Sequence, residues 1–179
     1  VGIWAGGIDG RDIHVMEALQ CIVERRRGGE TGVRSVEALR GERFWQALEA
    51  GSWEAGGWDR QLLDAALCRS NRLNPTKATY SNVFPTTDDL RRIAPGSYAY
   101  RFEYADGLKA TIVQLVGNVV GDCNVAARIK GGEIFSVLFY LPYYTMRNFF
   151  SPQVNHIESL FLTGKSPYPI ERTLLTTGM

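Results

Sequence analysis

The segment YAYRFEYADGLKATIVQLV, residues 98–116, predicts the centre of the fold. Aromatic side chains occupy alternate positions from Tyr98 to Tyr104, which is the period of a strand with one apolar face. Asp106-Gly107 follows, and this dipeptide is typical of a type I′ turn, which needs positive φ angles. The apolar run after the turn completes a β-hairpin. Because large aromatic side chains dominate burial, we interpret the aromatic row as a core or sheet-to-sheet contact, with ligand stacking as the less favoured alternative.

Strand signals recur on both sides of this hairpin. Gly131-Gly132 separates two strand-like runs at 124–130 and 133–141, which predicts a second hairpin. Residues 1–8 and 32–40 are expected to form further strands. The chain therefore has a sheet-forming second part that follows a largely helical first part.

Helix signals have the period of 3.6 residues and the expected start and stop residues. Helices are expected at 12–27, 42–50 and 58–70, with a helical turn near 87–93 and two further helices after Pro152 and Pro169. The apolar positions predict buried faces made of Ile13, Met16, Leu19 and Val23, of Leu62, Ala65, Ala66 and Cys68, and of Val154, Ile157, Leu160 and Phe161. His156 is expected on a solvated face.

Length and composition bound the function classes. The 179 residues, 45% hydrophobic and 22% charged, suit one soluble globular domain or a fragment of a larger protein, and Val1 as first residue hints at a trimmed chain. A net charge of +1 gives no field that favours nucleic acid or an anionic membrane. No apolar run reaches the roughly 20 residues of a membrane span. Three widely spaced cysteines predict reduced thiols and a cytoplasmic location.

The first candidate site is the segment AGGIDGRDIH, residues 5–14. Asp9, Asp12 and His14 converge where a glycine-rich loop enters a helix, a place where proton-transferring groups are often found. The alternative is that Asp12 caps the helix and His14 is an ordinary surface residue. Spacing alone favours this alternative.

Several chemistries lack their motif in this chain. No G-x-G-x-x-G follows a strand, no glycine cluster has the lysine of a phosphate loop, and no G-x-S-x-G occurs. The two histidines lie far apart, and no Cys/His spacing fits zinc, so no metal site is expected.

Three segments together resemble the carboxyl-terminal part of the Gfo/Idh/MocA oxidoreductases, which include glucose–fructose oxidoreductase and inositol dehydrogenase. Residues 6–19 resemble the family's helix with the pattern GG…D…H…D/E-x-L. Residues 102–111 are similar to its strand–Asp-Gly–strand segment, and residues 157–172 to its closing helix, GK-x-P turn and final helix. The three matches fall in family order and span most of the chain.

The resemblance implies a two-layer α/β fold, in which a large, mostly antiparallel sheet is covered on one face by helices. We expect a single domain over residues 1–179. In the family the open face is often used for dimerisation, so we also expect a homo-oligomer that forms through the sheet. In complete members a preceding Rossmann domain binds NAD(P). A lysine of that domain joins an aspartate and a histidine of this part in hydride transfer to or from a sugar, polyol or related substrate.

Within this resemblance, His14 matches the family's histidine. The family's aspartate stands four residues before it, where this chain has Gly10. Asp9 and Asp12 flank that position, and Asp9 is preferred because it lies on the loop side. The glycine loop and the Glu-Lys-Pro lysine do not occur in this sequence, so NAD or NADP is expected only together with a Rossmann domain, and no cofactor is expected on this chain.

Two functions of different class follow. The first is the substrate-binding and oligomerisation domain of an NAD(P)-dependent oxidoreductase, with His14 as general acid/base and Asp9 or Asp12 orienting its imidazole. The second is a stand-alone, cofactor-free carbohydrate-binding or scaffolding module. Neither uses nucleic acid or a membrane as partner.

Overall fold

The computed structural model describes residues 1–7, 10–71, 84–117, 119–141 and 150–179. The chain divides into two compact units, Val1–Phe139 and Tyr140–Met179, which are described separately below.

The first unit is built on a six-stranded sheet with the strand order β2-β3-β4-β1-β5-β6. The strands are β1 (Gly2–Trp4), β2 (Val33–Arg40), β3 (Tyr98–Tyr104), β4 (Lys109–Gln114), β5 (Cys123–Arg128) and β6 (Ile134–Phe139). β1 runs parallel to β4, and every other neighbouring pair is antiparallel. The expected α/β class with a large, mostly antiparallel sheet is therefore confirmed.

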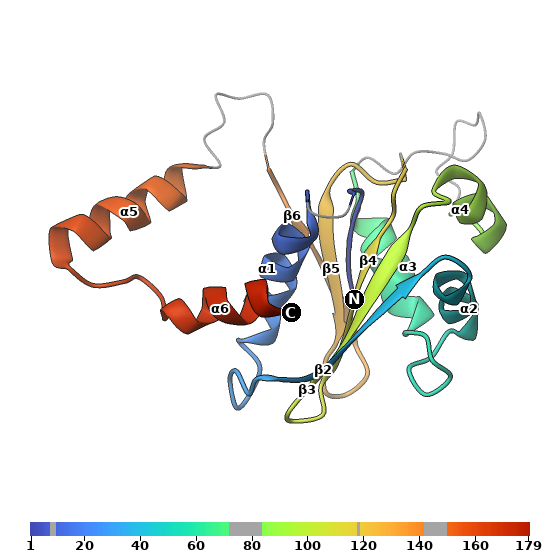
Figure 1. The fold of residues 1–179 in the computed structure, drawn as a ribbon, viewed down its shortest axis with the longest axis horizontal. Helices are drawn as coiled ribbons and strands as arrows, with labels where there is room; N and C mark the ends of the chain where they lie inside the picture. Colours follow the sequence, from blue (N-terminus) through green and yellow to red (C-terminus); the bar gives the residue numbers. More distant parts are fainter. Residues whose placement is uncertain (8–9, 72–83, 118, 142–149) are drawn as a thin grey trace. The chain divides into compact units, whose positions relative to one another are not determined.

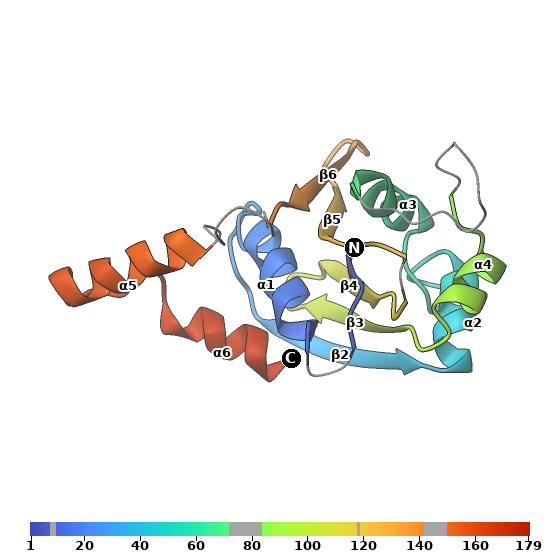
Figure 2. The same ribbon diagram turned by 90° about the horizontal axis from the view of Figure 1, so that it is seen from above.

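Helices pack on both faces of this sheet (Figures 1 and 2). One face carries α2 (Glu42–Ala50), α3 (Arg60–Arg69) and α4 (Thr87–Ile93), a helical layer of the kind that the family resemblance implies. The helix α1 (Asp12–Val23) covers the centre of the opposite face, where it contacts β1, β4 and β5. The face expected to be open thus holds one helix.

The side chains of the sheet alternate between two apolar layers. On the α2–α4 side, the buried cluster includes Phe44, Trp45, Leu48, Trp58, Leu63, Leu67, Leu90, Ala99, Val113, Leu115 and Ala126. On the α1 side, Tyr98, Phe102 and Tyr104 of β3 are at most 2% exposed. The predicted core role of the aromatic row is confirmed at these three positions, and Tyr100 is half-buried.

The first hairpin forms as predicted but with a different turn. The loop between β3 and β4 has three residues, Ala105 to Gly107, because the Tyr104 N–H donates to the Leu108 carbonyl at 2.9 Å. The Gly107 N–H donates to the Tyr104 carbonyl, and Gly107 has a φ of 84°. This is the three-residue loop that ends on a left-handed glycine, whereas the Asp-Gly pair predicted a two-residue type I′ turn.

Two helix predictions are wrong in detail. The helix α1 ends at Val23 rather than at residue 27, and Ala18, which is not among the residues predicted to be buried, is buried. On α3 the buried residues are Leu63, Ala66 and Leu67, so Ala66 alone of the predicted set is fully buried, while Leu62 and Ala65 are partly buried and Cys68 is exposed. This helix has apolar residues on two sides, and its packing against β5, β6 and β1 decides which side is buried.

The second unit consists of α5 (Ser151–Thr163) and α6 (Ile170–Gly178). Proline stands in the first turn of α5, and Gly164 ends the helix in the left-handed conformation, both as predicted. Its predicted buried stripe is wrong, because Val154, Ile157, Leu160 and Phe161 are between 42% and 84% exposed. A unit of this size has too few residues to bury such a face by itself.

The cysteines of the first unit differ sharply in environment, which gives a direct test of the packing. Cys123 in β5 is 2% exposed, and burial raises the pKa of its thiol to about 12. We expect Cys68, exposed on α3, to react with iodoacetamide at pH 8 at least about ten times faster than Cys123, because only the accessible thiolate is nucleophilic. Peptide mass spectrometry measures both rates. Equal labelling of the native chain would contradict the burial of β5, and denaturant should remove the difference.

Across the described residues, none of the helices has the length and apolar content that a membrane span requires.

Candidate functional site

The helix α1 begins at Asp12, and the carboxylate of this residue ties the first turn to the sheet. One oxygen, Oδ1, accepts a hydrogen bond from the Tyr98 hydroxyl at 2.6 Å and one from Gln114 Nε2 at 2.9 Å. The other oxygen accepts from the Tyr100 hydroxyl at 3.1 Å. The first turn of α1 is therefore tied to β3 and β4 by three hydrogen bonds to one carboxylate.

Two of the three side chains that donate to Asp12 are buried in the core. Tyr98 and Gln114 are 2% and 0% exposed, so their polar groups exchange water for Asp12 when the chain folds. Burial, followed by the hydrogen bond to Asp12, raises the pKa of Tyr98 far above its usual value, and burial also raises that of Tyr100. Both phenols therefore remain protonated donors. Asp12 is not a helix cap, because its side chain bonds to the sheet instead of to the first N–H groups of α1.

His14 lies two residues further along α1 and is exposed. Its ring packs against the indole of Trp4 in β1, with the ring centroids 5.7 Å apart. The Arg11 guanidinium lies 5.3 Å from the centroid of the same indole. The imidazole thus sits on a strand-anchored aromatic ring and is open to solvent, which is the accessibility that a general acid or base needs.

The predicted catalytic residues are only partly brought together. Asp12 and His14 share the first turn of α1, but no hydrogen bond joins them in the described part of the chain. The oxygens of Asp12 are taken up by sheet residues, so its observed role is to anchor the helix. Asp9, the preferred partner of His14, lies outside the described residues. The site prediction therefore stays a prediction.

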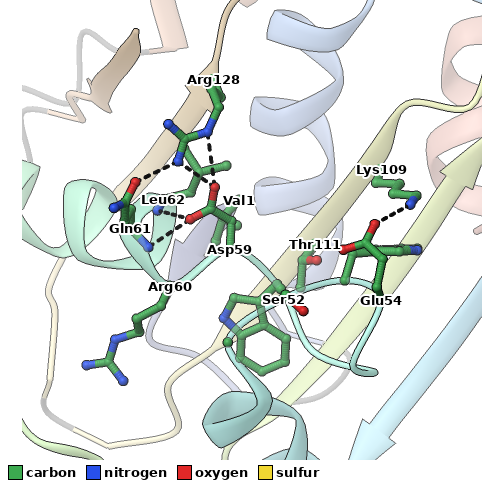
Figure 3. A pocket seen from close by; sticks show the side chains of 13 residues that line it. Val1, Ser52, Glu54, Asp59, Arg60, Gln61, Leu62, Lys109, Thr111 and Arg128 are labelled. Atoms are coloured by element: carbon green, nitrogen blue, oxygen red, sulfur yellow. Dashed lines mark hydrogen bonds and ion pairs between the residues drawn. The ribbon is translucent and has the colours of Figure 1, made fainter. Parts of the chain in front are cut away.

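A pocket of about 550 Å³ lies on the other face of the sheet (Figure 3). Its lining comes from the segment between α2 and α3, from the start of α3, from β4 and β5, and from Val1, which precedes β1. Thr111 of β4 lines it, whereas the next residue, Ile112, lies beside Val15 of α1 and Gly2. Because successive residues of a strand point to opposite faces, the pocket and His14 are on opposite sides of the sheet.

Two ion pairs form part of the wall of this pocket (Figure 3). Lys109 Nζ lies 2.8 Å from Glu54 Oε1, and Arg128 Nη2 lies 2.6 Å from Asp59 Oδ2. Asp59 also caps α3, because its Oδ1 accepts from the backbone N–H groups of Gln61 and Leu62. Burial alone would raise the pKa of Asp59, but Arg128 and these N–H groups outweigh it and hold the pKa below its usual value.

The segment that bears Trp53 and Glu54 is fixed to the sheet by Arg101. The Arg101 guanidinium lies 3.9 Å from the centroid of the Trp53 ring and donates to the Trp53 carbonyl at 2.7 Å. The same side chain pairs with Glu37 of β2 at 2.6 Å and is 11% exposed. This wall of the pocket is therefore preformed.

None of the pocket residues was among the candidate site residues predicted from the sequence. Their one sequence signal is GSWEAGGWD, residues 51–59, where two tryptophans and two carboxylates stand in a glycine-rich connection. The other contributors, Lys109 and Arg128, are ordinary charged residues of strands until the sheet brings them to this connection.

No group of His, Cys, Asp and Glu suitable for a metal ion occurs among the described residues. Nor does the described topology match a dinucleotide-binding unit, because β2, the strand that follows α1, lies at the sheet edge and pairs antiparallel with β3. The described strands thus do not form a unit of that kind. In comparisons with known proteins, no family model, no curated protein and no solved structure matches the chain. A function for this chain is therefore argued from the geometry of its sites.

Proposed function

We propose that this chain is the substrate-binding and oligomerisation domain of an NAD(P)-dependent oxidoreductase that acts on a sugar, polyol or related hydroxyl compound. The observation that carries the proposal is the exposed imidazole of His14, which rests on Trp4 at the end of a helix anchored by Asp12. An imidazole held in this way exchanges a proton with a substrate hydroxyl without moving the backbone. The nicotinamide belongs to a separate Rossmann domain, and no step on it is assigned to residues of this chain.

The apolar surface of α5 supports a role within a larger assembly. Within the second unit none of the residues of α5 is buried, and Phe161 and Leu162 are 84% and 87% exposed. Contiguous apolar surface of this kind marks a contact with another domain or chain.

The three free cysteines are consistent with a reducing compartment, and we propose that the protein is cytoplasmic.

The test of the acid/base role is His14→Asn in the protein encoded by the complete reading frame. We expect kcat for oxidation of its sugar or polyol to fall at least about 100-fold, which is the usual contribution of a proton-transferring side chain, with little change in KM. His156→Asn is the matched control, because His156 is an exposed histidine of α5. Unchanged turnover in the His14 variant would remove His14 from the mechanism.

Two further observations test the domain assignment. The reading frame before the Val1 codon should encode a strand–GxGxxG–helix unit, and a start codon beside Val1 would rule out the dehydrogenase assignment for this polypeptide. Light scattering should give a mass above that of one chain, and a monomer at every concentration would contradict the oligomerisation role.

A further inference from the structure

We propose that the pocket formed by the α2–α3 connection, α3 and β4 binds an uncharged polyhydroxylated ligand, such as a cyclitol or a mono- or disaccharide. This site is distinct from the one at His14, because the two lie on opposite faces of the sheet. The proposal does not depend on the proposed oxidoreductase role. It assigns a second, non-catalytic ligand site to the same domain.

The charges of the pocket select against an ionic ligand. Among the described residues of its lining, each of the three cationic side chains has a carboxylate partner: Lys109 pairs with Glu54, Arg128 with Asp59, and Arg60 with Asp64. A phosphate or nucleotide site needs donors that are left over for the anion. Here, a bound anion would have to compete with a carboxylate for every cation.

The same pairs suit hydroxyl groups. An ammonium or guanidinium beside a carboxylate offers hydrogen-bond donors and acceptors within about 3 Å of each other. A hydroxyl donates one hydrogen bond and accepts others, so two vicinal hydroxyls match such a pair without separating its charges. Glu54 is 75% exposed and Lys109 41% exposed, so this pair in particular is open to a ligand.

The size and the aromatic content of the pocket agree with this class of ligand. A volume of about 550 Å³ falls within the range of small-molecule sites, about 300 to 1,000 Å³. Trp53 contributes partly exposed aromatic surface to its lining, which is what the apolar C–H groups of a sugar ring pack against, whereas Trp58 is 2% exposed and lies behind it in the core. Because Arg101 and the Gly57 N–H, which donates to the Ser52 carbonyl, hold the connecting segment, little ordering is needed on binding.

The four tryptophans make the test position-specific. In ¹H–¹⁵N spectra of the 179-residue chain, the indole signals of Trp53 and Trp58 report the pocket, and that of Trp4 reports the surroundings of His14. We expect myo-inositol or maltose to shift the Trp53 and Trp58 signals with a dissociation constant of about 1 to 10 mM, and the Trp45 signal to stay in place. Trp53→Phe assigns its signal by removing it.

A pair of exposed glutamates provides the matched variants. Glu54→Ala should weaken binding of the sugar that shifts these signals about tenfold, as expected for a lost hydrogen bond to a charged group, whereas Glu49→Ala on α2 should leave it unchanged. The proposal is overturned if neither sugar shifts Trp53 or Trp58 at about 100 mM, if inorganic phosphate alone does so, or if Glu54→Ala binds like the parent. A sugar-induced shift of Trp4 alone would overturn it while leaving the proposed function intact.

Discussion

Replacing Asp12 by alanine should lower the free energy of unfolding by about 3 to 4 kcal/mol, because three hydrogen bonds to one carboxylate are lost together. Two of the three donors, the Tyr98 hydroxyl and the Gln114 amide, belong to side chains that are almost completely buried. A buried donor without an acceptor costs about 1 to 3 kcal/mol, and the loss of both outweighs any helix propensity gained by alanine. Urea unfolding followed by circular dichroism measures this change.

Two matched variants distinguish the loss of the Asp12 hydrogen bonds from the stability lost when any aspartate is removed from a helix start. Asp12→Asn retains one acceptor oxygen and should lose about half as much stability. Asp88→Ala removes an exposed aspartate from the first turn of α4, where only the favourable helix-end charge of about 0.3 to 1 kcal/mol is lost. If Asp12→Ala is no more destabilising than Asp88→Ala, the carboxylate does not anchor α1 to the sheet.

Gly57→Ala should also be strongly destabilising, by about 2 to 4 kcal/mol, for a steric reason. A β-carbon on Gly57 would stand 2.1 Å from the Ala47 carbonyl oxygen and 3.2 Å from the β-carbon of Ala50. The carbonyl oxygen belongs to the backbone of α2, so the contact can be relieved only if the helix or the connecting segment moves. Either shift would disturb Trp58, which packs against Phe44 in the core.

Gly7→Ala is the control for this prediction, because a β-carbon on Gly7 would meet no atom within 4 Å. Its stability should stay within about 0.5 kcal/mol of the parent, the usual range for surface substitutions. Thermal unfolding of the two variants gives the comparison. A Gly57→Ala chain that is as stable as the Gly7→Ala chain would show that α2 and the pocket segment are not in close contact.

The elements that depend on local interactions were predictable from the sequence. The sequence predicts both hairpins from the alternation of apolar and polar residues and from the glycines at the turns. It predicts α2 and the short α4 from residues typical of helix ends. All of these signals lie within a few positions of the element that they predict. The hairpin at Asp106-Gly107 shows the limit of this reasoning. Its turn has three residues because Tyr104 pairs with Leu108 across the two strands, and the Asp-Gly dipeptide alone does not fix that pairing. The exposed state of His14 was likewise one of the two alternatives that spacing allowed.

The arrangement of the candidate sites could not be predicted in this way. Asp12 meets Tyr98 and Gln114, which stand 86 and 102 positions away, because the three-residue strand β1 enters the sheet beside β4. No periodicity reports such a long-range pairing. The pocket arises similarly, when the connection bearing Glu54 reaches Lys109 across 55 positions.

By itself, the sequence determined the kinds of elements and the two antiparallel hairpins, because these depend on neighbouring residues, whereas the mostly antiparallel character of the whole sheet was expected only from the family resemblance. The tertiary structure decided the strand order, the face that each helix covers, and the partners of each charged side chain. It assigned Asp12 to the sheet rather than to His14, and it left the apolar residues of α5 exposed although their spacing is that of a buried face. The physical reason is that burial and charge pairing depend on what packs against a residue, and that packing is set by segments far away in the chain.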